Sequence, residues 1–65
     1  GMTFQEVLDG LRRSLAELYL RDPGLSLTDI ALLLGFAEQS SFTRAFRRWR
    51  GVSPAAWRRR LRQND

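Results

Sequence analysis

The sequence predicts an all-α domain built from four helices. Apolar residues recur every three or four positions over almost the whole chain, which is the period of amphipathic helices, and no alternation typical of β-strands occurs. Glycine and proline interrupt this pattern at Pro23-Gly24, at Gly35 and between Gly51 and Pro54, so they divide the chain into four helical stretches. With 65 residues, of which 43% are hydrophobic, we expect residues 1–65 to form one small domain with a single core.

The first helix is expected within residues 3–21. Thr3 is placed to cap it, and Glu6 three residues later completes the sequence pattern of a capping box. The apolar residues predict one stripe of an amphipathic helix: Phe4, Val7, Leu8, Leu11, Leu15 and Leu18. The helix ends at Asp22-Pro23-Gly24, because proline cannot continue a helix.

The second helix begins after Ser26, an N-cap residue, and Asp29 in its first turn favours the positive end of the helix. One face of this helix is apolar and carries Leu27, Ile30, Ala31 and Leu34. We expect Gly35 to end the helix with a positive φ angle, and Phe36 to pack back against it.

The third helix is expected to begin near Glu38 or Gln39 and to run to Arg50, where Gly51 ends it. At about 100° per residue, a narrow core stripe is formed by Phe42, Ala45, Phe46 and Trp49. The opposite face is polar, with Thr43 and Arg48 on its flanks and Ser40, Arg44 and Arg47 at its centre.

The fourth helix is expected over residues 54–62. Ser53 supplies an N-cap, and Pro54 occupies the first helical position, where proline is favoured. Trp57 and Leu61 form an apolar pair one turn apart. The arginines around this pair form the densest charge run of the chain: Arg58, Arg59, Arg60 and Arg62.

Composition excludes several classes of protein. Without cysteine or histidine, the chain has no disulfide, no zinc finger and neither the usual general base nor a thiol nucleophile, so we expect no enzyme, no metal and no cofactor. The longest apolar run covers residues 31–34, whereas about 20 residues are needed to span a bilayer. We therefore expect no membrane-spanning segment, and we favour a cytoplasmic protein whose partner is not a membrane.

The charges are divided unevenly along the chain. Residues 1–38 hold three arginines against six acids, whereas residues 39–65 hold eight arginines against one acid. The C-terminal part is therefore strongly basic, which favours a polyanion as the partner.

Residues 27–50 form a helix-turn-helix pattern, in which two helices are joined by a short turn containing glycine and the second is basic on its outer face. Ala31 is small enough for the second helix to cross close to the first, and Gly35 allows the chain to reverse. Phe36 and Phe42 hold the two helices at a fixed angle. The spacing from Gly35 to Phe42 is wider than in the common form of the motif, which predicts a turn longer by one residue. The polar face of the second helix is then free to enter a DNA major groove.

Three segments resemble the second helix-turn-helix of the AraC/XylS family of bacterial transcription regulators: residues 30–36 (IALLLGF), 39–48 (QSSFTRAFRR) and 51–54 (GVSP), followed by Trp57-Arg58. The resemblance covers about residues 4–62. It implies a homeodomain-like helix-turn-helix fold, in which residues 4–20 form the linker helix between two helix-turn-helix units. It also implies double-stranded DNA as a partner, and a longer parent protein with an upstream helix-turn-helix and an effector domain. We expect the 65-residue chain itself to be monomeric.

The first turns of the third helix are the candidate base-reading site. The guanidinium fork of Arg44 suits the O6 and N7 atoms of guanine, and the family resemblance places base contacts near the start of this helix. The predicted base contacts are Gln39, Ser40, Thr43 and Arg44. A simpler interpretation of the same residues is solvation, or helix capping in the case of Gln39 and Ser40.

Phosphate contacts supply affinity without sequence information, and we predict them at Arg47, Arg48, Ser53, Arg58 and Arg59. A solvated terminal helix is the simpler interpretation of the arginines in the fourth helix. Two other functions remain open. One is a protein-interaction module that docks a partner domain through residues 4–20, and the other is binding of an anionic membrane surface through residues 57–62.

Overall fold

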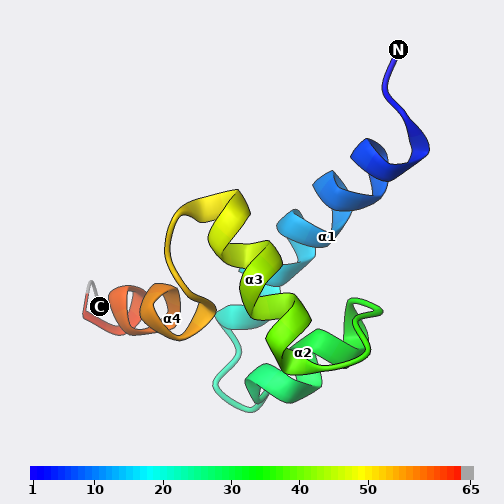
Figure 1. Ribbon diagram of the computed structural model, residues 1–65. Helices are drawn as coiled ribbons and strands as arrows, with labels where there is room; N and C mark the ends of the chain where they lie inside the picture. The colour runs from blue at the N-terminus through cyan, green and yellow to red at the C-terminus, as the bar shows by residue number, and fades with distance from the viewer. Residues whose placement is uncertain (64–65) are drawn as a thin grey trace.

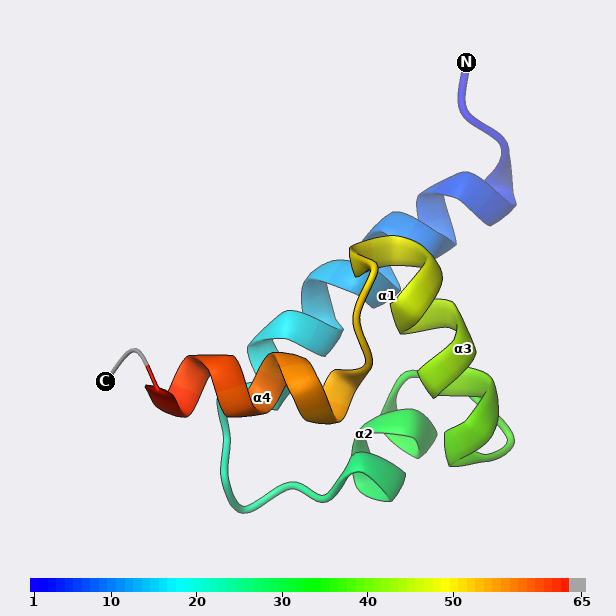
Figure 2. The ribbon, with the colours of Figure 1, turned by 60° about the vertical axis from the view of Figure 1, so that its left-hand side comes forward.

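The structure, a computed structural model, describes residues 1–63 and confirms an all-α fold with four helices in that range. In chain order these are α1 (Phe4–Leu20), α2 (Leu27–Leu33), α3 (Gln39–Arg50) and α4 (Pro54–Gln63). α2 packs against both α1 and α3, and α4 also packs against α1 and α3 (Figure 1). In both Figure 1 and Figure 2 the first turns of α1, drawn in blue, extend beyond the other three helices.

Side chains cap three of the helices at the predicted residues. The Thr3 hydroxyl accepts a hydrogen bond from the Glu6 backbone N–H at 3.1 Å, and the Ser53 hydroxyl accepts one from the Ala56 N–H at 3.1 Å. Each cap satisfies a backbone donor that has no partner inside its helix.

The cap of α2 is a reciprocal capping box. The Ser26 hydroxyl accepts from the Asp29 N–H, and the Asp29 carboxylate accepts from the Ser26 N–H, both at 3.0 Å. The pKa of Asp29 lies below its ordinary value, mainly because the Ser26 backbone N–H bonds the charged carboxylate and further because of the Ser26 side chain.

The turn after α2 has the geometry expected from Gly35. Gly35 has a φ of 88°, a left-handed conformation that strains other residues. The Phe36 N–H donates to the Ala31 carbonyl at 2.9 Å, and the Gly35 N–H donates to the Leu32 carbonyl at 3.1 Å. This pair of bonds is a Schellman motif, which closes the end of α2 and directs the chain back toward α3.

The core lies where α1, α2 and α3 meet, and its buried members are Ala16, Leu20, Ile30, Ala31, Leu34, Phe42 and Phe46. The predicted core stripe of α3 is confirmed, with Phe42, Ala45 and Phe46 buried and Trp49 half-buried. The Phe46 ring meets Phe42 and Trp57 edge to face, with centroid distances of 5.9 and 5.8 Å. Trp57 therefore attaches α4 to the aromatic side of α3.

Most of the apolar stripe of α1 does not face this core, although Leu15 is half-buried against it. Phe4 is 82% exposed, and Val7, Leu11 and Leu18 are 54, 56 and 58% exposed. The buried residues of α1 are Ala16 and Leu20, which lie on a different side of the helix. Within residues 1–63 no helix combines the length and the apolar character that a membrane crossing requires.

Candidate nucleic-acid interface

The outward face of α3 carries polar and basic side chains. Gln39, Ser40, Arg44 and Arg47 are exposed, while Thr43 is half-buried on the flank of this face. The helix contains no acidic residue, and three of its arginines lie in the last turn. Because the aromatic residues on its other side are buried, the rotation of α3 about its axis is set. The four predicted base contacts therefore lie together on one helix, near its first turns.

The start of α3 is not capped by a side chain. Its N-cap residue is Glu38, which makes no capping hydrogen bond, so neither Gln39 nor Ser40 serves as the N-cap. Gln39 is instead held by α2, because its side-chain carbonyl accepts a hydrogen bond from the Thr28 hydroxyl at 2.9 Å. This bond leaves the NH₂ group of the Gln39 amide as a donor on the exposed surface. The sequence did not predict this role for Thr28. Its only indication is that Thr28 is a polar residue in the first turn of α2.

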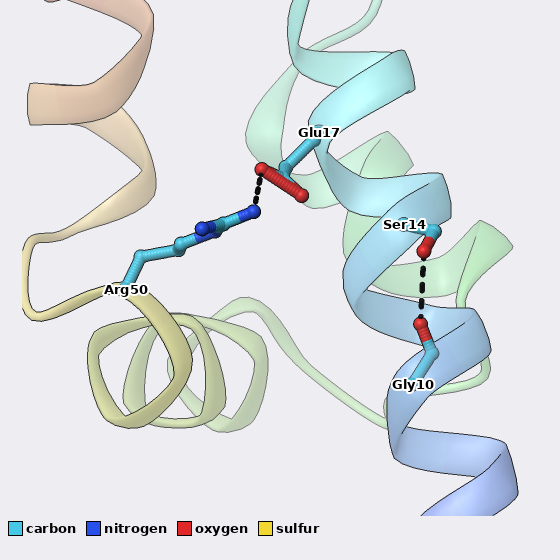
Figure 3. A network of polar contacts seen from close by, with 4 residues as sticks. All are labelled: Gly10, Ser14, Glu17 and Arg50. Atoms are coloured by element: carbon cyan, nitrogen blue, oxygen red, sulfur yellow. Dashed lines mark hydrogen bonds and ion pairs between the residues drawn. The ribbon is translucent and has the colours of Figure 1, made fainter.

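Three arginines hold the helices together. Arg50 at the end of α3 pairs with Glu17 of α1, as Figure 3 shows beside the Ser14–Gly10 bond within α1. The guanidinium carbon of Arg50 also lies 5.3 Å from the Trp57 ring centroid. Arg50 thereby connects the end of α3 to both α1 and α4.

The other two arginines of this kind donate to main-chain carbonyls. Arg58 of α4 donates through Nε to the Leu20 carbonyl at 3.1 Å and through Nη2 to the Asp22 carbonyl at 3.3 Å. Arg12 of α1 donates through Nε to the Leu34 carbonyl at 3.0 Å. A cation at the C-terminal end of a helix is favourable, because the last carbonyls lack partners there.

The side chains of the remaining arginines make no hydrogen bond or ion pair within the described residues. These residues are Arg13, Arg21, Arg44, Arg47, Arg48, Arg59, Arg60 and Arg62. Among the predicted phosphate contacts, Arg47, Arg48 and Arg59 are exposed. Ser53 is occupied as the α4 cap but keeps its hydroxyl proton, and Arg58 has two of its donors engaged.

A short helix pair whose second helix presents a basic outer face defines a DNA-binding helix-turn-helix module. A family model described as a helix-turn-helix domain matches residues 1–60. The chain belongs to this family, the helix-turn-helix domain of AraC-type transcription regulators.

Known relatives are transcription regulators. The chain is 52% identical over 58 residues to the ornithine utilization regulator of Pseudomonas aeruginosa and 43% identical over 58 residues to the HTH-type transcriptional regulator VirS of Mycobacterium tuberculosis. Each match covers 89% of this chain and 17% of the relative. The crystal structure of the transcriptional regulator CdpR from Pseudomonas aeruginosa superposes with a TM-score of 0.87 and 41% identity, over 91% of this chain and 19% of that one.

These findings confirm the predicted helix-turn-helix fold and place the chain in a family of DNA-binding transcription regulators. The family is one of DNA-binding regulators and not of enzymes. Membership in it does not favour the alternative function, a protein-interaction module. The chain spans 17% of the length of the two curated relatives.

Proposed function

We propose that the chain binds double-stranded DNA with sequence specificity by placing α3 in the major groove. The observation that carries this proposal is the division of α3 into a buried aromatic side and an exposed polar side. A helix of this kind, supported by a second helix across a tight turn, has the dimensions and exposure that a major groove accepts.

The base contacts in this proposal are Gln39, Ser40, Thr43 and Arg44. Arg44 is exposed, and no described residue accepts a hydrogen bond from it, so its planar fork is available for O6 and N7 of a guanine. Gln39 presents its NH₂ group because Thr28 holds the carbonyl of the same amide. Ser40 and Thr43 supply hydroxyl groups, which both donate and accept.

Phosphate contacts in this proposal come from Arg47, Arg48, Arg59, Ser53 and the free N–H groups of Arg58. Arg47 and Arg48 continue the basic face of α3 beyond the base-reading turns. Each phosphate contact releases condensed counterions, so affinity is expected to fall steeply as the salt concentration rises.

The longer parent protein is part of the same proposal. The apolar stripe of α1 is exposed here, and the relatives extend well beyond the matched segment. An upstream helix-turn-helix unit that packs on Phe4, Val7 and Leu11 would cover this stripe and add a second reading helix, and an effector domain would complete the regulator. The chain by itself is monomeric in this proposal, and the parent acts in the cytoplasm.

Selection from a pool of random duplexes, followed by titration of the selected sequence, tests the base-reading role. Arg44→Ala is expected to lose about 1–3 kcal/mol of discrimination at one base pair. Arg13→Ala, which removes the same charge from an exposed position on α1, serves as the control and should retain the discrimination. An equal loss by Arg44→Ala on every sequence would instead make Arg44 a phosphate contact.

A further inference from the structure

We propose that Arg12 is a positioning residue for DNA recognition, because it fixes the angle between α1 and the turn that orients α3. This inference rests on the proposed DNA-binding function. It adds to DNA recognition a residue of α1, the helix that precedes the helix-turn-helix. This residue is neither a proposed base contact nor a proposed phosphate contact.

Arg12 makes two contacts with the turn between α2 and α3. Its Nε donates to the Leu34 carbonyl at 3.0 Å, across 22 positions of sequence. Its guanidinium carbon lies 4.7 Å from the centroid of the Phe36 ring. One side chain of α1 therefore bonds the backbone of the turn and covers its aromatic ring at the same time.

The end of α2 depends on this contact for part of its hydrogen bonding. The Schellman bonds satisfy the Ala31 and Leu32 carbonyls, and Arg12 satisfies the carbonyl of the C-cap residue Leu34. α2 has no basic residue in its own last turn. The cation that stabilises the negative end of this helix therefore comes from α1.

Phe36 transmits the position of the turn to α3. Its ring centroid lies 5.9 Å from that of Phe42 and 6.4 Å from that of Trp49, and both residues belong to the inner side of α3. A continuous line of contacts thus leads from Arg12 through Phe36 to the helix whose opposite face carries Arg44. Because hydrogen bonds weaken steeply with distance and angle, a small tilt of α3 would disturb base contacts before it unfolded the domain.

Arg58 provides a structural comparison. It too is half-buried and donates to main-chain carbonyls, but its acceptors are Leu20, the last residue of α1, and Asp22 in the turn that follows. It joins α4 to α1 and makes no hydrogen bond to the α2–α3 turn. Loss of Arg12 and loss of Arg58 should therefore differ in their effect on the angle between α1 and α3.

The first measurement follows this angle without DNA. The chain contains no cysteine, so Arg13→Cys on α1 and Arg48→Cys on α3, both at exposed positions, give a unique pair of spin labels. Addition of Arg12→Gln is expected to shift or widen the distance distribution, whereas addition of Arg58→Gln leaves it unchanged. Circular dichroism verifies that each protein remains folded. An unchanged distribution with Arg12→Gln would overturn the positioning role.

The second measurement compares the affinity for the selected duplex with the affinity for a scrambled duplex. Arg12→Gln should lower this ratio by about tenfold, the scale of one hydrogen bond to a charged group. Arg13→Gln controls for charge, and Thr3→Ala controls for a general loss of stability, since it removes a helix cap far from the turn. Arg12→Lys keeps the charge but not the planar group over Phe36, so it should recover the ratio only in part.

The outcomes separate the two proposals. If Arg12→Gln keeps the same ratio as Arg13→Gln and Thr3→Ala, the positioning role is refuted while the DNA-binding function stands. If the unmodified chain shows no preference for any duplex sequence, the proposed function fails, and the role of Arg12 in recognition fails with it.

Discussion

The inner side of α3 and the apolar stripe of α1 have the same sequence pattern and opposite surroundings. Both show apolar residues at helical spacing. On α3 these residues are buried or half-buried, with Phe42 and Phe46 fully so. On α1 four of the six stripe residues are exposed, and Phe4 keeps 82% of its surface in solvent. Periodicity thus identifies the apolar side of a helix, but burial depends on whether a neighbouring element covers that side.

The four exposed apolar residues of the α1 stripe share one side of the helix, whereas exposed apolar residues on small proteins are usually scattered. Exposed apolar residues gathered on one side are typical of an interaction site. In the proposed function it receives the upstream part of a longer parent. In that proposal, the core of α3 is completed by the other helices of this chain, whereas the stripe of α1 is completed by the upstream segment.

The largest effect is expected from a substitution on the buried inner side of α3. Phe42→Ala leaves a cavity at a completely buried position, so it should lower the free energy of unfolding by about 3–5 kcal/mol, which is most of the stability expected of a small domain. Urea unfolding followed by tryptophan fluorescence measures this loss. Phe42→Leu retains most of the apolar volume and should remain folded with a smaller loss. A change of only a few tenths of a kcal/mol in Phe42→Ala would mean that α3 is not anchored through this ring.

A much smaller effect is expected at the exposed stripe. Leu11→Ser in the 65-residue chain should change the free energy of unfolding by within about 0.5 kcal/mol, since Leu11 is 56% exposed. The same substitution in the longer parent should be clearly destabilising if the proposed upstream unit covers the stripe. Thermal unfolding of both proteins provides the comparison. Equal midpoint shifts in the two would refute an upstream partner on this stripe.

The smallest effect concerns the capping box of α2, which depends on neither the inner side of α3 nor the stripe of α1. The folded-state pKa of Asp29 is lowered, so its stabilising contribution is present above the unfolded pKa and is lost as the pH falls through the folded value. The difference in thermal midpoint between the unmodified chain and Asp29→Asn should therefore be seen at neutral pH and shrink below a pH of 3.8, the ordinary value for Asp. A difference that stays constant into strong acid would show that the carboxylate charge does not contribute.

The helices, their caps and the turn could be predicted from the sequence because local chemistry determines them. Ser26 and Ser53 have the side chains that bond free N–H groups, and Gly35 tolerates the φ of 88° that ends α2. The aromatic spacing of α3 is equally local, since it follows from 3.6 residues per turn. The candidate base-reading residues follow from the same projection, and their contacts with DNA remain predictions.

The roles of the arginines could not be predicted in this way. Arg12, Arg50 and Arg58 hold helices together, while Arg44 and Arg47 are exposed and unbonded among the described residues. One signal was present for Arg12, which precedes the buried Ala16 and Leu20 at intervals of one helical turn. This spacing indicates that Arg12 lies on the buried side of α1 only once Ala16 and Leu20, and not the leucine stripe, are known to face the core.

Local sequence is enough to place the four helices, the apolar side of α3 and the basic charge of the C-terminal part. These properties depend on neighbours within one or two turns, so propensity, capping and periodicity are sufficient. The buried side of α1 and the bonding of each arginine depend instead on contacts between residues far apart in sequence, so they are established only when the helices pack. Arg12 bonds the Leu34 carbonyl across 22 positions of sequence, and no pattern within one or two helical turns predicts that pairing.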